Sequence, residues 1–396
     1  MYVTRPLSLY RKNPKALSLE PPEGPNSGYL VIYDEEADQT PTCFGLSNDN
    51  GIRYLPFPQN KVVNIADCDY SQDVVFIPVL NHPLCSNRYY AIVPYCKYKG
   101  EAFTSSKEEN MGTSCFGRHV QDVKTRPLDP SDAYQQFEII TESHHYGFTA
   151  KSIASDGFPP DKLRYKYWTA KMQTPKYYNL MNQALGLNSS LRATLPSFDF
   201  PCFNDSSDAS VVVGKWYCPF MFVEEVMKLE DQVKKSMFYE MTLEQRWDRV
   251  FECENLGKEG KLVSVNVVVE TEDVCVAGRK AAWDESNVKN KVVWFRSYDD
   301  RAGNQEFRIG LNMVIVERMK WEQERFGWVS GNGRKGRVER AEEFDGMGNS
   351  WTKFGCYVLV ERFVLKRMDG SLVLTYDFKH THQIRCKWDF GNESSC

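Results

Sequence analysis

One run of strict alternation near the end of the chain limits its possible folds more than any other feature. From Leu372 to Trp388 every even-numbered residue is apolar, aromatic or histidine, and every odd-numbered residue except Val373 is polar. Side chains of a strand point alternately to its two faces, so this two-residue period predicts one long strand with one buried face and one solvated face. Such strands occur in antiparallel sheets with one solvated face. Asp369-Gly370, just before the run, predicts a hairpin turn from a preceding strand over 357–367.

Further strands are predicted where apolar residues alternate or cluster between turn signals. In the first third they cover 28–33, 74–79 and 89–93, after an extended arm over 1–27. In the last third they cover 263–269, 292–295 and a long stretch from Phe307 to Trp321, with a bulge before Phe326.

The middle of the chain carries helix signals. Asp129-Pro130 predicts the start of a short helix through Phe137, and apolar residues at helical spacing predict another over 226–237. Thr242-Leu-Glu-Gln245 has the form of a capping box and predicts a helix over 243–253.

These patterns together predict an α+β fold dominated by β structure. We expect an N-terminal arm and β region over residues 1–150, a helical middle over 151–255, and a C-terminal antiparallel β region with long amphipathic strands over 256–396.

Charge and cysteine content restrict the function. A net charge of −4 spread over 396 residues lacks the basic patch that a nucleic-acid-binding protein needs. The start of the chain has no apolar signal segment, and no run has the length of a membrane span, so we expect a cytoplasmic protein. No two of the 12 cysteines are separated by only two residues, so the usual zinc-knuckle spacing is absent.

Two groups of residues could carry chemistry. His380 and His382 point the same way from the predicted strand and could bind a metal, although packed histidines on the apolar face are the favoured interpretation. Cys96, Cys115 and His119 are the residues that most resemble a metal-ligand set. Cys115 and His119 could instead act as a thiol nucleophile and its base. The histidine pair has no third ligand nearby in the sequence, and Cys115 with His119 has no orienting acid. We therefore assign no catalytic, cofactor-binding or metal-binding residue.

The segment 330–350 is long, charged and rich in glycine. Its part from Gly331 to Gly336 matches the glycine fingerprint of dinucleotide sites, but a charged stretch follows it and no βαβ unit surrounds it, which favours a hairpin loop. Loops of such length are usually functional or disordered, so we expect contacts with other proteins to use this segment.

Several segments together resemble a family known as domain of unknown function 1262. They are Met1-Tyr-Val-Thr-Arg-Pro-Leu-Ser8, Gly24-Pro-Asn-Ser-Gly-Tyr-Leu-Val-Ile32, Asp156-Gly-Phe-Pro-Pro160, Val211-Val-Val-Gly-Lys-Trp-Tyr-Cys-Pro-Phe-Met-Phe222, Met237-Phe-Tyr-Glu-Met-Thr-Leu-Glu-Gln-Arg-Trp247 and Val316-Glu-Arg-Met-Lys-Trp-Glu322. The resemblance implies a land-plant protein without an established activity, from a family with some members associated with stress or defence. It supplies no catalytic residue.

Three functions follow as hypotheses. The first is a non-enzymatic interaction or scaffold protein in stress or defence responses. The second is a lipid- or membrane-interacting protein of pore-forming type, because long amphipathic strands are what such proteins use. The third is an enzyme that uses Cys115 and His119.

Overall fold

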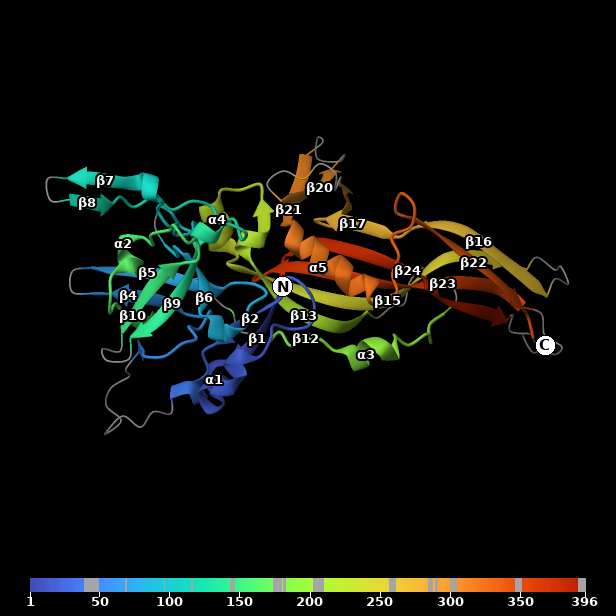
Figure 1. The fold of residues 1–396 in the computed structure, drawn as a ribbon. Helices are drawn as coiled ribbons and strands as arrows, with labels where there is room; N and C mark the ends of the chain where they lie inside the picture. Colours follow the sequence, from blue (N-terminus) through green and yellow to red (C-terminus); the bar gives the residue numbers. More distant parts are fainter. Residues whose placement is uncertain are drawn as a thin grey trace.

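Strands dominate the computed structural model of this chain, and they form an elongated molecule with short strands at one end and long strands at the other (Figure 1). The structure describes residues 1–38, 50–67, 70–95, 97–114, 117–142, 147–173, 180, 183–201, 210–255, 261–283, 288, 291–299, 305–345 and 351–390. All statements below concern these residues.

The largest sheet has nine strands in the order β18-β17-β24-β23-β15-β13-β1-β2, with β12 paired to β13. Three of its strands, β15, β23 and β24, are long, and each pairs with a neighbour along most of its length. The bounds are β1 (Tyr2–Pro6), β2 (Gly28–Ile32), β12 (Gly186–Leu187), β13 (Val211–Pro219), β15 (Phe238–Glu254), β17 (Glu272–Val276), β18 (Arg279–Lys280), β23 (Trp351–Arg367) and β24 (Leu372–Phe390).

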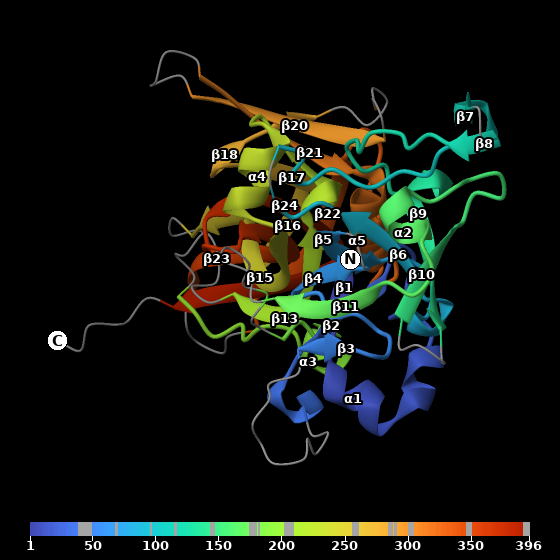
Figure 2. The same ribbon diagram turned by 90° about the vertical axis from the view of Figure 1, so that its left-hand side faces the viewer.

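A seven-stranded antiparallel sheet forms the other end of the molecule, with the order β10-β9-β6-β5-β4-β11-β3. Its strands are β3 (Gly51–Ile52), β4 (Val62–Ala66), β5 (Ser71–Pro78), β6 (Arg88–Ile92), β9 (Gln136–Glu142), β10 (Gly147–Ser152) and β11 (Thr169–Gln173). Strands β1 and β2 form the edge of the nine-stranded sheet that lies next to the seven-stranded sheet (Figure 1). Figure 2 shows the molecule from the end that carries the seven-stranded sheet. The Tyr2 hydroxyl on β1 donates to the carbonyl of Pro78 on β5 across 2.7 Å, which joins the sheets.

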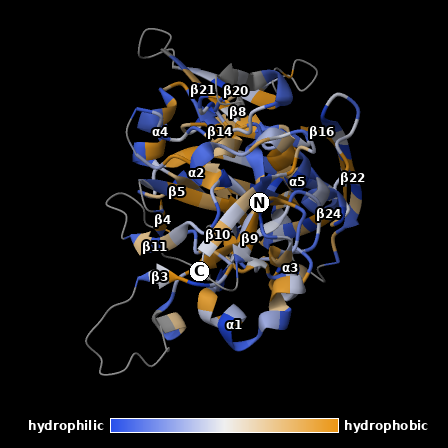
Figure 3. Ribbon diagram, turned by 60° about the vertical axis from the view of Figure 1, so that its left-hand side comes forward, coloured by the Kyte–Doolittle hydropathy of each residue, from blue (hydrophilic) through white to orange (hydrophobic). Residues whose placement is uncertain are grey.

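Three smaller sheets complete the described strands. They comprise β14 (Val223–Glu225), β19 (Ala282–Trp283), β20 (Val292–Asp299) and β21 (Gln305–Asn312) in one sheet, β16 (Leu262–Glu270) with β22 (Lys335–Glu343), and β7 (Met111–Ser114) with β8 (Gly117–Val120). The α-helices are short except for the last: α1 (Leu7–Lys12), α2 (Asp161–Arg164), α3 (Ser189–Thr194), α4 (Leu229–Lys235) and α5 (Met313–Glu324). Apolar residues gather on the interior strands and polar residues on the surrounding loops (Figure 3).

The predicted C-terminal strand is confirmed by β24. Its predicted solvated face is wrong in the first half of the strand, because the odd-numbered Val373, Thr375 and Asp377 are buried as well as the even-numbered residues between them. The turn at Asp369-Gly370 joins β24 to β23, and Gly370 has a φ of 83°, a conformation that glycine adopts without strain. The strand carries one irregularity. The partner of Val358 is Ile384 and that of Leu359 is His380, so β24 bulges between them. The predicted strands at 28–33, 74–79, 89–93, 263–269 and 292–295 correspond to β2, β5, β6, β16 and β20.

The predicted helix over 243–253 is wrong. This segment belongs to β15, which pairs with β13 on one edge and β23 on the other. The capping-box signal is local, whereas ladders on both edges satisfy the backbone of the whole 17-residue strand.

The predicted strand from Phe307 to Trp321 is correct only in its first half. Strand β21 ends at Asn312, whose side chain accepts a hydrogen bond from the Val314 amide at 3.2 Å and caps α5. Ile315 and Met319 then share the buried side of this helix, at a spacing of four residues. The region before Phe326 is therefore the end of a helix and not a bulge.

The helical middle is not confirmed. Residues 151–255 contain three short helices together with the long strand β15. The segment 129–137 is also not an α-helix, because only a 3-10 turn over Ala133–Gln135 precedes β9. The division at residues 150 and 255 stays a prediction, and the nine-stranded sheet draws strands from all three parts.

Candidate functional site

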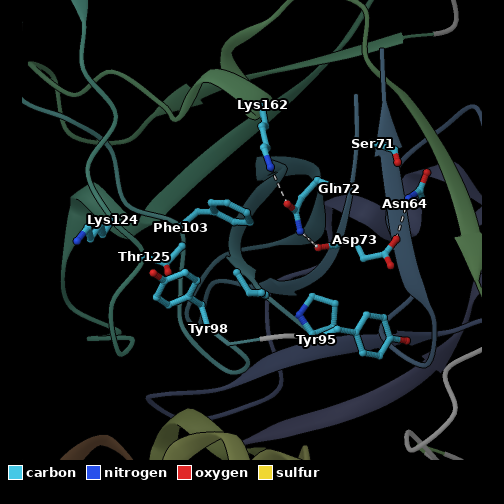
Figure 4. Close-up of a pocket in the computed structure, with 12 residues that line it drawn as sticks. Asn64, Ser71, Gln72, Asp73, Tyr95, Tyr98, Phe103, Lys124, Thr125 and Lys162 are labelled. Atoms are coloured by element: carbon cyan, nitrogen blue, oxygen red, sulfur yellow. Dashed lines mark hydrogen bonds between the residues drawn. The ribbon is translucent and has the colours of Figure 1, made fainter. Parts of the chain in front are cut away.

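A pocket of about 460 Å³ opens on the seven-stranded sheet (Figure 4). Strands β4 and β5 supply Asn64, Gln72 and Asp73 to its lining. Asn64 points away from the face on which its neighbours Val63 and Ile65 enter the apolar core, since side chains alternate along a strand. Ser71 at the start of β5 also lines it. The other lining residues come from the segments that follow β6 and from α2: Val93, Pro94, Tyr95, Tyr98, Phe103, Lys124, Thr125 and Lys162.

The polar side of the pocket is already ordered by internal hydrogen bonds. Asn64 and Asp73 are partners in the β4–β5 register, and the Asn64 amide donates to the Asp73 carboxylate at 2.7 Å. The Lys162 ammonium donates to Oε1 of Gln72 at 2.8 Å (Figure 4). These bonds hold the side chains in place without a ligand, which lowers the entropy lost when one binds.

The aromatic side of the pocket consists of Tyr95, Tyr98 and Phe103 (Figure 4). Tyr98 is 41% exposed, whereas Phe103 is buried. Burial, together with the charge of Asp73, raises the pKa of the Tyr95 hydroxyl. That hydroxyl therefore stays protonated at neutral pH and can donate a hydrogen bond.

This combination suits a small ligand with an apolar face and several hydroxyl groups. Aromatic side chains offer a flat surface for stacking, while amide and carboxylate groups accept and donate hydrogen bonds at its edge. A ligand site usually consists of a partly apolar hollow with a small number of polar groups that converge on the ligand. Lys124 and Lys162 add positive charge at two edges.

No motif in the sequence predicted this pocket. Its residues come from separate segments, and the predicted strand over 74–79 began after Gln72 and Asp73. One weak signal was present, since two tyrosines, Tyr95 and Tyr98, lie close together where the chain turns polar. Only the fold brings them opposite Asn64 and Asp73.

His380 takes part in a buried charge cluster. This cluster comprises Arg192 of α3, Glu322 and Gln323 of α5, Gln245 of β15, Glu361 of β23 and His380 of β24, all at most 3% exposed. Nε2 of His380 lies 2.9 Å from Oε1 of Gln323 and 3.7 Å from Oε2 of Glu361. His382 stands beside His380 with ring centroids 5.4 Å apart. In the described part of the chain, no three His, Cys, Asp or Glu side chains gather as a metal site.

Arg192 is the centre of the charge cluster. Its guanidinium donates to the Glu361 carboxylate at 2.8 and 2.5 Å and to Glu322 Oε1 at 2.8 Å. Burial alone would raise the pKa of the Glu361 carboxyl, but the contacts with His380 and Arg192 lower it to about 2. The cluster joins two helices to the long strands and presents no open surface, so we interpret it as structural.

The cysteine and histidine group lies mostly beyond the described residues. Cys96 and Cys115 are outside them, and His119 lies on β8, with its backbone opposite Gly112. The hypothesis that Cys115 and His119 form a catalytic pair therefore stays a prediction.

Segment 330–350 is not the continuous loop that its composition indicated. Gly331 and Gly333 have φ values of 71° and 60° and make a turn, after which Lys335 begins β22. This strand pairs antiparallel with β16, so no nucleotide-binding βαβ unit surrounds the glycines. Positions 346–350 lie outside the described residues.

The model of the family described as "Protein of unknown function (DUF1262)" matches residues 23–116. This match supports the resemblance to that family in the segment that contains the pocket residues from Asn64 to Phe103. No curated protein is significantly similar to the chain. Among solved structures, the crystal structure of Cry35Ab1 is similar, with 10% sequence identity and a TM-score of 0.43, over 84% of this chain and 90% of that one. The likeness is distant, and nothing about function follows from it.

Proposed function

We propose that this protein is a non-enzymatic interaction protein that recognises a polyhydroxylated ligand, such as a saccharide unit, in the pocket on the seven-stranded sheet. The observation that carries the proposal is the meeting of an exposed aromatic ring, Tyr98, with an ordered pair of hydrogen-bonding groups, Asn64 and Asp73, in one hollow. A sugar ring presents an apolar face to such an aromatic side chain and hydroxyl groups to such an amide and carboxylate.

The composition of the pocket favours binding over catalysis. Asp73 is the single carboxylate among its described lining residues, which include neither histidine nor cysteine. Hydrolysis of glycosides ordinarily uses two carboxylates that face one bond, and nucleophilic catalysis uses a thiol or hydroxyl with an adjacent base. The setting in stress or defence responses, and the cytoplasmic location, rest on the sequence analysis.

The test is a glycan array followed by calorimetric titration of the best saccharide. Tyr98→Ala and Asp73→Asn should each weaken binding about tenfold or more, since each removes one stacking or hydrogen-bonding contact worth 1–2 kcal/mol. Tyr54→Ala is the matched control, because Tyr54 is 57% exposed and does not line the pocket. The proposal is wrong if the wild-type chain binds no saccharide, or if both pocket variants bind as well as the control.

A second candidate function is association with lipid surfaces, and a specific observation favours it. Strands β16 and β22 form a separate two-stranded sheet that shares no ladder with the long strands. Val263 and Val265 of β16 pack on the apolar cluster beneath, while the alternate residues Ser264 and Asn266 are exposed. Both strands have nine residues, and roughly 9–11 residues is the length of a membrane-spanning β-strand.

Release of this sheet would break side-chain packing but no ladder hydrogen bonds with the rest of the fold. None of the helices in the described residues has the length and apolar content of a membrane span. Co-sedimentation with vesicles of neutral and anionic lipids, and leakage of a trapped dye, test this function. Absence of binding at every lipid composition would remove it.

A further inference from the structure

Two cysteines face each other across the longest ladder of the molecule. Cys356 of β23 and Cys386 of β24 are partners in an unbroken stretch of register that runs from Lys353 opposite Asp389 to Val358 opposite Ile384. Directly opposite residues in an antiparallel pair have Cα atoms about 4.5–5.5 Å apart. Disulfide-bonded cysteines have Cα atoms about 4.4–6.8 Å apart. The register therefore places the two backbones at a separation that a disulfide can bridge.

The side chains also point to the same side of the sheet. Phe354 and Trp388, the partners two positions away on the same face, have ring centroids only 4.5 Å apart. The thiol of Cys386 hydrogen-bonds to Cys356, which lowers the pKa of Cys356 and raises that of Cys386. The two thiols therefore lie within hydrogen-bonding reach of each other.

Access and surroundings distinguish this pair from other cysteines. Cys356 is buried in the apolar cluster under β16 and β22. Cys386 is half-buried at the border of this cluster, so a small oxidant can reach the pair from solvent. Cys275 of β17 is also half-buried, but its ladder partners are Lys280 and Thr375. Among the six described cysteines, Cys356 and Cys386 alone are partners in a ladder.

We propose that Cys356 and Cys386 are a dithiol site that hydrogen peroxide oxidises to a cross-strand disulfide. The Cys356 thiolate attacks one peroxide oxygen and breaks the O–O bond, which yields a sulfenic acid and a hydroxide that takes up a proton to become water. The Cys386 thiol then attacks the Cys356 sulfur. The S–S bond forms, and the sulfenic hydroxyl leaves with the thiol proton as a second water. One peroxide accepts the two electrons that the two thiols lose. This site is independent of the pocket.

Peptide mapping of the purified full chain tests the site directly. The chain is treated with hydrogen peroxide, free thiols are blocked with N-ethylmaleimide, and the digest is analysed without reduction. We expect one linked peptide pair that contains Cys356 and Cys386 and disappears after dithiothreitol treatment. Because the link fixes two strands, the melting temperature of the oxidised chain should rise by about 2–4 °C.

Variants separate this site from general thiol oxidation. Cys275→Ser should leave the linked peptide unchanged. Cys386→Ser should abolish it and should leave Cys356 as a sulfenic acid, which dimedone labels once urea has exposed this buried side chain. Absence of the link in the wild-type chain, or pairing of either cysteine with a different cysteine, would overturn the proposal, and neither result depends on how a variant folds.

Discussion

The pocket and the charge cluster are both groups of polar side chains that hydrogen-bond to one another, yet they differ in solvent access. In the pocket, Asn64, Gln72 and Asp73 are half-buried around an open hollow. In the charge cluster, Arg192, Glu322 and Glu361 are almost completely buried. Buried charges are tolerated only when nearly every charged atom has an ion-pair or hydrogen-bond partner, because desolvation costs on the order of several kcal/mol per ion. The charge cluster therefore stabilises the fold, whereas the polar groups of the pocket remain able to bind a ligand.

The largest expected effect comes from removal of the central cation of the cluster. Arg192→Ala leaves Glu361 buried without its arginine and takes from Glu322 one of three cations, the others being Arg318 and Arg325. It should reduce the free energy of unfolding by about 3–5 kcal/mol. Urea denaturation measures this loss. The control is Arg126→Ala, which removes a 53% exposed partner of Asp132 and should cost about 0–1 kcal/mol. Equal losses for the two variants would contradict the difference between buried and open polar groups.

The pH dependence of stability tests the same cluster without removing its arginine. The pKa of Glu361 is about 2 in the folded chain and 4.5 ordinarily. A lowered pKa gives stability that is complete above pH 4.5 and is lost as the pH falls toward 2, here about 3 kcal/mol. Asp377, whose pKa is also lowered, acts in the same direction. The measurement is therefore the difference between wild type and Glu361→Gln in urea unfolding from pH 5 to pH 2. Parallel pH profiles would contradict the prediction.

A smaller effect is expected where the N-terminal segment lies on α5. Gly24 has a φ of 100°, and a Cβ atom there would lie 1.4 Å from Nη1 of Arg318. Gly24→Ala should destabilise the fold by about 2–3 kcal/mol, from backbone strain and overpacking together. Gly370→Ala is the matched control, because its φ of 83° carries strain but no atom lies within 4 Å of the added carbon. It should cost only about 1 kcal/mol in thermal unfolding. A control loss as large as that of Gly24→Ala would exclude the contact with Arg318 as the cause.

The smallest effect on stability is expected in the pocket. Tyr98→Ala removes an exposed ring and should change the free energy of unfolding by less than about 0.5 kcal/mol. Denaturation of this variant beside the wild type measures the change. A loss above 2 kcal/mol would place Tyr98 among the residues that hold the fold together and would remove the contrast with the charge cluster.

Local periodicity predicted the elements that their own residues specify. β24 is a strand along its whole predicted length, although its first half is buried on both faces, and the Asp369-Gly370 turn needs only its own residues. The helix over 243–253 failed because Thr242 to Gln245 satisfy a local capping rule, whereas two long-range ladders determine the structure. The strand predicted from Phe307 to Trp321 failed in its second half because the alternation of apolar residues continues past Asn312, where the structure changes to a helix.

Residue patterns alone predicted the β-rich class and the C-terminal hairpin, and they contained no recognisable catalytic or cofactor motif. Contacts between distant segments place Asn64, Asp73 and Tyr98 in one pocket, bring Arg192 to Glu322 and Glu361, and set Cys356 opposite Cys386. The difference is one of distance along the chain. Turns and strand periodicity depend on neighbours along the chain, whereas pockets, buried ion pairs and cross-strand partners depend on register and packing between distant segments.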